Sequence, residues 1–493
     1  MKIRIWLAFA LLSAYFVGGY LNNTMTNSIG SLTIALVDDH SLIIDDYAPY
    51  PNDMSQREGH LYSGMPPGLS FVMVPVYLIL KPILALVPAQ TLSRADQVIQ
   101  GNIHAKFRDF DKVSKKRATL ALLLIFGVFF LSIPLAIVSG QRFYKTCESV
   151  YGPSRLQSIA MLTVFMMFGT MWTDFSATLY HTTLGAVLLW LGFTGLFYPA
   201  KPLTNAKVFF LALILGAIGA IDYPAIAYAL VVVGGYAFQN RRNLMAVSIA
   251  AFGVAIPLAL LAIYHTYAFG HPWVTAYQMR AVPFPPDFFL NSHRSGIFRY
   301  LPTGANVMRT FFDSKCSVLI YCPMLVFGMI AAGRQFKNTK FALPWLVVGT
   351  VLLANLLYFT SLPIGIDVAG GSFGARYTVY SVPFALFALV PYWEKIRLKL
   401  GNLGSGMVLL ILAIPSTLYL FYGSPNLALG QYLEKMIHQG PAGYTLAKFY
   451  EAGWIHSPLF SWIGTGIIGA VCVYLCRQPL RANTYKLPLK SAE

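Results

Sequence analysis

Carboxylates gather in one short stretch near the start of the chain. The chain has only 19 Asp and Glu among its 493 residues. Six of them lie within about 20 residues: Asp38, Asp39, Asp45, Asp46, Asp53 and Glu58. A carboxylate can act as a general base, taking a proton from a hydroxyl as its oxygen attacks an electrophilic carbon. Partial burial beside a membrane can raise the pKa of such a group into a useful range. The alternative is a solvated acidic loop.

A turn-rich stretch follows the carboxylates. Residues 59–68 read Gly-His-Leu-Tyr-Ser-Gly-Met-Pro-Pro-Gly, in which Gly and Pro favour turns. His60, Tyr62 and Ser63 add polar side chains that can donate or accept hydrogen bonds. A rigid polar turn beside clustered carboxylates predicts the wall of a binding site, with these three residues as substrate contacts.

The run before the carboxylates, Ser28 to Val37, is expected to position them. Ile29, Leu32 and Leu36 recur at helical spacing. This pattern predicts a short amphipathic helix that lies on the membrane surface and ends near Asp38. Such a juxtamembrane helix would deliver the carboxylates to the boundary between lipid and water.

The composition indicates an all-α polytopic membrane protein. Hydrophobic residues make up 56% of the chain, charged residues 11%, and the mean hydropathy is +0.59, whereas soluble domains are about 25% charged. Apolar runs of about 20 residues, long enough to cross a bilayer, recur throughout. We predict one transmembrane domain, 1–493, with about 12 transmembrane helices. They lie near 5–21, 118–140, 156–174, 182–199, 207–221, 223–238, 244–267, 317–333, 341–362, 375–393, 403–422 and 457–476.

Basic residues predict how these spans are oriented. The net charge is +17, but Lys and Arg form short clusters between apolar runs, as loops that hold topology do, rather than a nucleic-acid-binding face. The positive-inside rule then places 22–117 and 268–316 outside as the two large extracytoplasmic loops, and the tail 477–493 in the cytoplasm. Segment 69–88 must not cross, because every later loop would otherwise change side. Its Pro75 and Pro82 favour a broken, re-entrant or interfacial segment.

Other signals are weaker. Asp174 and His181 flank a short outer turn and could contact a substrate, although capping of helix ends is the ordinary role of such residues. Asp222 precedes Tyr223 and Pro224, a typical capping arrangement at a helix start. The five cysteines do not have metal-site spacing. A phosphate-binding Gly-rich loop is absent from the sequence, so ATP-driven work is not indicated.

The sequence resembles the GT-C superfamily of membrane glycosyltransferases. The resemblance rests on the order of three features: an acidic first loop, Gly-His-x-Tyr-Ser-x-x-Pro-Pro-Gly at 59–68, and Gly-Gly-Ser-Phe-Gly-Ala-Arg-Tyr at 370–377. Weaker matches are Phe-Gly-His-Pro at 269–272 and Tyr-Cys-Pro at 321–323. It covers roughly residues 1–395 and is greatest for the bacterial branch related to protein O-mannosyltransferases and lipid A aminoarabinose transferases.

The resemblance implies transfer of a sugar from a polyprenyl-phosphate donor to a hydroxyl of a lipid, glycan or protein, on the extracytoplasmic face. An Asp of the first loop would be the base. Many relatives carry Asp-Glu soon after the first helix, where this chain has Thr26-Asn27, so we rank the candidates as Asp45, Asp53, then Asp39. Basic side chains would hold the lipid phosphate, and Arg suits this because its planar guanidinium binds phosphate in a bidentate manner. The candidate substrate-binding residues are His60, Tyr62, Ser63, His181, Arg294, Arg299, Lys315, Asp367 and Arg376.

Cofactor, partners and location follow from the same resemblance. The lipid-linked sugar is a co-substrate, no resident cofactor or metal is indicated, and the partners are the donor, membrane lipid and the acceptor. The expected location is a bacterial inner membrane with the site facing the periplasm. Two rival hypotheses are a transporter or flippase of lipid-linked sugars, which would place charges at the bilayer midplane, and a lipid-linked glycan polymerase or ligase, which normally has its large outer loop late in the chain.

Overall fold

The computed structural model describes nine segments of the chain: residues 3–16, 24–47, 54–88, 114–279, 304–313, 317–338, 342–361, 376–422 and 458–481. Within them nearly all regular structure is helical, which confirms the all-α prediction. The longer helices are α1 Ile3–Tyr15, α2 Thr24–Asp38, α3 Gly68–Leu86, α5 Ser114–Gly127, α6 Ile133–Tyr151, α7 Leu156–Phe168, α9 His181–Phe197, α10 Asn205–Ile221, α11 Ile226–Gln239, α12 Leu244–Phe269, α14 Gly304–Phe312, α16 Pro323–Asn338, α17 Ala342–Thr360, α18 Val382–Tyr422 and α21 Pro458–Arg481.

Short helical elements connect these longer helices. They are η2 Val128–Ser132, which joins α5 to α6, η3 Pro153–Arg155, α8 Met171–Ser176, η4 Tyr223–Ala225, η5 Ala276–Gln278, α15 Val318–Tyr321 and η6 Arg376–Ser381. α18 is two helices that meet at Gly401, where φ is 70°. Glycine adopts this backbone without the steric cost that a Cβ adds.

Membrane-compatible helices account for most of the described chain. Five are long and apolar enough to span a bilayer, within Gly68–Leu86, Thr119–Tyr151, Leu244–Phe269, Ala342–Thr360 and Tyr377–Ser416. A described helix covers most of each of the twelve predicted spans, while the number that cross the membrane stays a prediction. Several predicted ends are wrong: α6 continues to Tyr151 instead of stopping at 140, α7 stops at Phe168 instead of 174, and α16 continues to Asn338 instead of stopping at 333.

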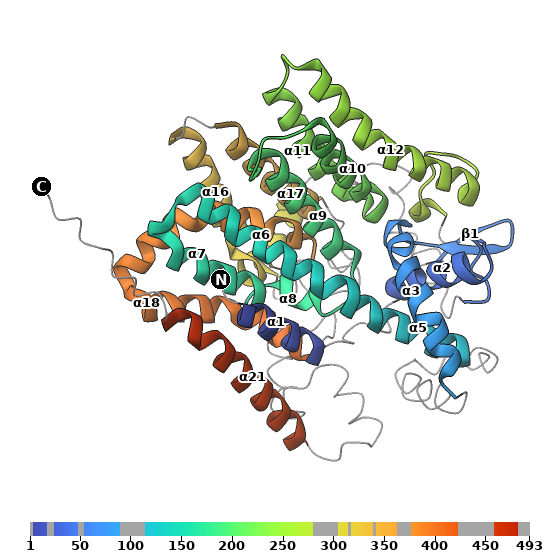
Figure 1. Cartoon of the computed structure of the whole chain (residues 1–493), viewed down its shortest axis with the longest axis horizontal. Helices are drawn as coiled ribbons and strands as arrows, with labels where there is room; N and C mark the ends of the chain where they lie inside the picture. The colour runs from blue at the N-terminus through green and yellow to red at the C-terminus, as the bar shows by residue number, and fades with distance from the viewer. Residues whose placement is uncertain are drawn as a thin grey trace, which may run out of the picture.

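The helices pack around an aromatic core. Trp190 of α9 is fully buried, and its ring contacts those of Phe143, Phe384 and Phe387 from α6 and α18. In Figure 1 α6 and α9 lie in the centre of the molecule, with α10, α11 and α12 along one side and α1 and α21 along another. Because most of α9 is buried among other helices, the positions of both of its ends in the bundle are fixed.

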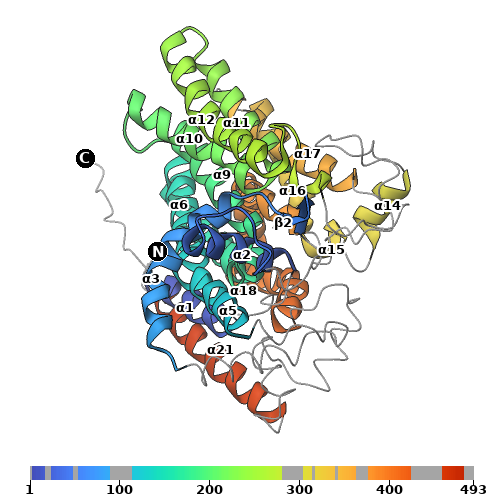
Figure 2. The same cartoon turned by 90° about the vertical axis from the view of Figure 1, so that its right-hand side faces the viewer.

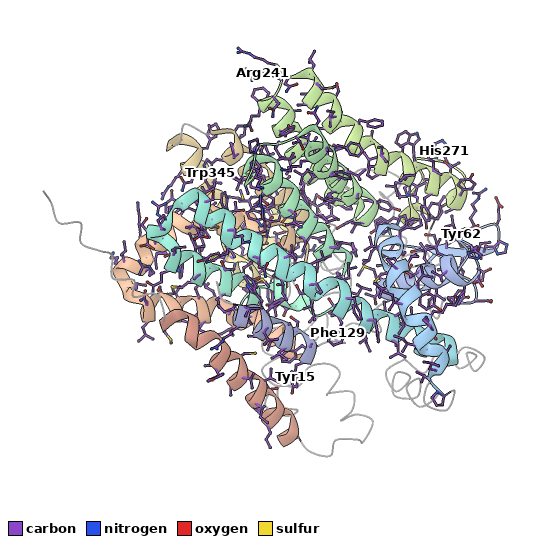
Figure 3. All side chains as sticks on the ribbon, viewed as in Figure 1. Tyr15, Tyr62, Phe129, Arg241, His271 and Trp345 are labelled. Atoms are coloured by element: carbon purple, nitrogen blue, oxygen red, sulfur yellow. The ribbon has the colours of Figure 1, made fainter. Side chains whose placement is uncertain are left out.

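The two ends of the bundle can be followed on α12. Figure 3 shows Arg241 just before its start and His271 just after its finish, at opposite ends of this helix. Tyr62 of the acidic loop lies beside the His271 end, and its ring packs edge-on against Phe269 at a centroid distance of 6.1 Å. The acidic loop therefore covers the end that the positive-inside rule assigns to the extracytoplasmic side.

A β-hairpin interrupts the helices in the first loop. Strand β1, Met54–Arg57, pairs antiparallel with β2, His60–Ser63. Glu58 and Gly59 form a two-residue turn with positive φ values of 52° and 83°, as a type I′ hairpin requires. The turn chemistry of residues 59–68 was recognised from the sequence, but the strands were not predicted.

α2 is more buried than predicted. It ends at Asp38, as expected. However, polar residues on several sides of it, including Thr26, Ser28, Ser31 and Thr33, are buried along with the apolar ones. The prediction of a surface helix with one wet face is therefore wrong, because α3, α5 and β2 pack around α2. Figure 2, which looks onto this end of the molecule, shows α2 beside β2 and α5.

α3 is one continuous helix. Pro75 and Pro82 lie inside it, so the prediction that they would break it is wrong. Helices of membrane proteins tolerate proline where neighbouring groups satisfy the freed backbone. Asp38 ties α3 to α2, since it accepts hydrogen bonds from Tyr77 at 2.9 Å and from Lys81 at 2.8 Å. That the segment does not cross the membrane stays a prediction.

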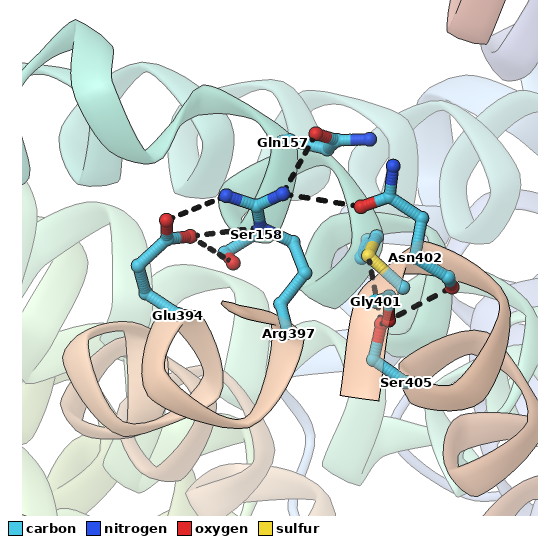
Figure 4. A network of polar contacts seen from close by, with 8 residues as sticks. Gln157, Ser158, Glu394, Arg397, Gly401, Asn402 and Ser405 are labelled. Atoms are coloured by element: carbon cyan, nitrogen blue, oxygen red, sulfur yellow. Dashed lines mark hydrogen bonds and ion pairs between the residues drawn. The ribbon is translucent and has the colours of Figure 1, made fainter. Parts of the chain in front are cut away.

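A polar network joins α7 to α18 at the opposite end from the acidic loop. Arg397 donates to both carboxylate oxygens of Glu394, at 2.6 and 3.0 Å, and Glu394 also accepts from Ser158 of α7 (Figure 4). Arg397 further donates to Gln157 and Asn402. Charge-assisted, bidentate bonds of this kind are stronger than neutral ones. The network fixes the turn at Gly401 against α7.

We expect Arg397→Gln to lower the free energy of unfolding by about 1–2 kcal/mol, because Glu394 loses a charge-assisted partner in a mostly buried setting. Thermal melting in detergent measures this. Lys399→Gln is the matched control, since it removes an exposed cation from the same turn. Equal melting temperatures for the two variants would show that the network contributes nothing to stability.

Candidate functional site

Asp45 and His60 form a pair beside the turn of the hairpin. The two Asp45 carboxylate oxygens accept hydrogen bonds from His60 Nδ1 at 2.8 Å and from the Leu61 backbone N–H at 2.6 Å. Both side chains are about half exposed, at 41% for Asp45 and 52% for His60. A histidine whose Nδ1 faces a carboxylate presents its Nε2 atom outward. The pair therefore offers solvent a carboxylate and an oriented imidazole.

Asp38 and Asp39 are used differently from Asp45. Asp38 binds Lys81 and Tyr77, as described above, and so holds α2 to α3. Asp39 interacts with Tyr47: burial, followed by a hydrogen bond to Asp39, raises the pKa of Tyr47 above its usual value. Tyr47 therefore stays neutral and can donate. These structural roles leave Asp45, the first of the ranked bases, as the best placed of the described candidates.

Ser63 and its neighbours anchor the hairpin to the bundle. Ser63 Oγ lies 3.0 Å from Ser28 Oγ, and the Gly64 N–H donates to the same Ser28 oxygen. On the other side, Ser55 donates to the Ala276 carbonyl at 2.7 Å. Ser63 is buried, and in this structure it supports the loop. The predicted substrate-contact role of Ser63 stays a prediction.

A second polar group lies inside the bundle, and we call it the buried cluster: His181, Asp222 and Tyr380. Asp222 Oδ2 accepts a hydrogen bond from the Tyr380 hydroxyl at 2.9 Å and lies 3.9 Å from His181 Nε2. All three side chains are buried. Asp222 occupies the capping position before η4 but makes no side-chain cap bond. The capping interpretation of Asp222 and of His181 is therefore wrong, since neither side chain caps a helix.

Asp174 is a third, separate carboxyl group. It is 3% exposed, and neither of its oxygens has a hydrogen-bond partner among the described residues. Thr170, not Asp174, caps α8, so the capping interpretation fails here as well. Burying a polar group without a partner is costly. A carboxyl kept under such conditions is a typical feature of a functional site.

We expect Asp174→Asn to leave the melting temperature unchanged or raise it, because an amide carries no charge into the interior. Activity should fall at least tenfold if the carboxyl meets a substrate. The paired measurement is thermal melting and sugar transfer on the same preparation. A lower melting temperature with full activity would assign Asp174 a structural role.

The first loop abuts the helix that carries Asp222. A Cβ atom on Gly68 would lie 2.6 Å from the backbone oxygen of Ala220, two residues before Asp222. Tyr223, just after Asp222, packs edge-on against Tyr277, whose hydroxyl approaches Met65 at 4.0 Å. The Pro-Pro-Gly end of the turn-rich stretch therefore connects the hairpin to the end of α10.

Several predicted site residues lie outside the described residues: Asp53, Arg294, Arg299, Lys315 and Asp367. For Arg376 only the backbone is described, and it begins η6. η6 contacts α8 and α9, the helices of Asp174 and His181. The predictions for these six side chains stay predictions.

The arrangement combines an exposed acid–base pair with a polar cluster buried in the bundle. Asp45 and His60 could accept a proton, while η6 brings the backbone of Arg376 to the helices of the buried cluster. Among the described residues there is no group of three or more His, Cys, Asp or Glu that could hold a metal ion. His181 was among the predicted site residues, but its grouping with Asp222 and Tyr380 was not predicted. Asp222 has the sequence pattern of a helix cap, and Tyr380 lies 158 positions further along the chain, where no local pattern links the two.

Three solved structures resemble the fold. ArnT from Cupriavidus metallidurans bound to undecaprenyl phosphate aligns with a TM-score of 0.48 at 11% identity, over 95% of this chain and 74% of its own. An oligosaccharyltransferase from Archaeoglobus fulgidus in the apo form gives 0.41 at 11% identity, over 91% of this chain and 59% of its own. Archaeal AglB from the same organism, in complex with an inhibitory peptide and a dolichol-phosphate, gives 0.36 at 10%, over 93% and 56%. No family model and no curated protein matches the chain.

Proposed function

We propose that this protein is a membrane glycosyltransferase that moves a sugar from a polyprenyl-phosphate donor to a hydroxyl acceptor. The acceptor is a lipid, a glycan or a protein, and the reaction takes place on the extracytoplasmic face, in the periplasm of a bacterium whose inner membrane holds the enzyme. Of the similar structures, ArnT is bound to undecaprenyl phosphate and AglB is in complex with a dolichol-phosphate. The proposal for this chain rests on its own residues.

In the proposed step the acceptor oxygen attacks the anomeric carbon of the donor sugar. A new carbon–oxygen bond forms to the acceptor, and the bond between the anomeric carbon and the phosphate oxygen breaks. Asp45, held by His60, takes the acceptor proton. The polyprenyl phosphate leaves with the electron pair, and Arg376 stabilises its charge.

The observation that carries the proposal is that the acidic residues of the first loop differ in their contacts and exposure. Asp38 and Asp39 are committed to Tyr77, Lys81 and Tyr47. Asp45 instead stays half exposed and hydrogen-bonded to an imidazole, on a hairpin that is fixed to the bundle on two sides. A structural acidic loop does not require such an oriented pair.

The test is mass spectrometry of envelope glycolipids and secreted proteins from a deletion strain. We expect one sugar to disappear from its acceptor and the corresponding polyprenyl-phosphate sugar to accumulate. Wild-type complementation should restore the sugar. Unchanged glycans would contradict the proposal, and accumulation of the donor on the cytoplasmic side alone would favour a flippase.

A further inference from the structure

The segment η6 is attached to the bundle by polar contacts on two of its residues. The Tyr380 hydroxyl donates to Asp222 of the buried cluster at 2.9 Å. Asn355 of α17 donates to the Tyr377 carbonyl at 2.8 Å and is fully buried. One anchor directly follows α10 and the other lies in α17, and they hold opposite ends of one short turn.

Aromatic packing fixes the same turn. The Tyr377 ring meets Tyr358 of α17 edge-on at 5.1 Å, and the Tyr380 ring lies 5.3 Å from that of Tyr228 of α11. Tyr228 is also hydrogen-bonded to Asn355, at 3.1 Å. The helices α11 and α17, together with Asp222 after the end of α10, therefore share the positioning of η6.

The backbone of α9 is shaped to admit Tyr380. A Cβ atom on Gly185 would overlap the Tyr380 hydroxyl. Only glycine at this position lets the hydroxyl pass α9 and reach Asp222, which lies 3.9 Å from His181 at the start of the same helix. The Tyr380–Asp222 bond thus depends on the absence of a side chain at Gly185.

We propose that Asp222 and Tyr380 are positioning residues that set the place of η6, and with it Arg376, for binding the phosphate of the lipid-linked donor. The inference rests on the proposed function. Arg376 is the first residue of η6, four positions before Tyr380. Because a displacement of about 1 Å can cost two orders of magnitude in rate, an anchored turn is required if Arg376 is to meet a phosphate.

The test is binding of undecaprenyl phosphate to the purified full-length protein in lipid nanodiscs, followed by native mass spectrometry. We expect Tyr380→Phe to weaken binding about tenfold and Arg376→Gln to weaken it more. The double variant should bind no more weakly than Arg376→Gln alone, since Tyr380 acts through Arg376. Asp222→Asn keeps an acceptor oxygen for Tyr380 and should retain most of the binding, whereas Asp222→Leu should behave like Tyr380→Phe.

Tyr264→Phe is the matched control, because the Tyr264 hydroxyl is buried without a hydrogen-bond partner among the described residues. It should bind as the wild type does. Failure of the wild type to bind undecaprenyl phosphate would overturn the proposed function. Wild-type binding that is lost in Arg376→Gln but unchanged in Tyr380→Phe would overturn only the positioning inference, and so would additive effects in the double variant.

Discussion

Asp45→Asn is expected to lower the rate of sugar transfer by about two to four orders of magnitude, which is the usual contribution of a general base. The amide can still accept the Leu61 N–H bond, so the hairpin should keep its shape. Binding of the lipid-linked donor should change little, because the proton is transferred only during the reaction. The measurement is transfer of labelled sugar from purified donor to acceptor by the protein in nanodiscs, with donor binding measured in parallel.

Glu58→Gln is the control for Asp45. Glu58 is a carboxylate of the same hairpin, but its side chain is 73% exposed and pairs with Arg57 beside it in the sequence. Its variant should transfer sugar at the wild-type rate. Full activity in Asp45→Asn would remove Asp45 from the chemistry and transfer the role of base to Asp53 or Asp39.

Gly68→Val is expected to lower transfer by about a hundredfold. Its Cβ atom would approach the Ala220 backbone oxygen at 2.6 Å, so α3 must move away from the end of α10. A backbone atom cannot rotate aside as a side chain can. The shift would separate the hairpin from the buried cluster. Displacing a catalytic group by about 1 Å can lower the rate by about a hundredfold. The strain should also lower the stability by about 1–3 kcal/mol.

Gly234→Val separates the local clash from the general effect of a β-branched residue in place of glycine. Gly234 lies in α11 and has no atoms within 4 Å of the Cβ position. Its variant should retain nearly full activity. If Gly68→Val transfers sugar as well as Gly234→Val does, the contact between the first loop and α10 is not needed for function.

The helical architecture could be predicted because hydropathy reports burial in lipid directly. Trp190, Phe193 and their neighbours form an apolar run, and that run became α9 within two residues of the predicted ends. The effect of prolines inside a helix was harder to predict. Pro75 and Pro82 carry a local penalty that the sequence shows, but the packing of α3 on α2 that compensates for it is visible only in the fold.

The candidate site could be predicted only where it depends on local sequence. The turn chemistry around Gly59 and the end of α2 at Asp38 are local properties, and both were expected from the sequence. Asp222 and Tyr380, by contrast, find each other across a long stretch of chain. Asp222 and Tyr380 are 158 positions apart, and no local pattern marks such a pair.

Where the donor phosphate binds tests the account most directly. A cryo-electron microscopy structure of the protein with bound undecaprenyl phosphate is expected to show the phosphate in contact with the Arg376 guanidinium, with the Asp45 carboxylate close enough to reach an acceptor at the same sugar. A phosphate bound on the opposite membrane face, or Asp45 and Arg376 too far apart to contact one sugar phosphate, would contradict it.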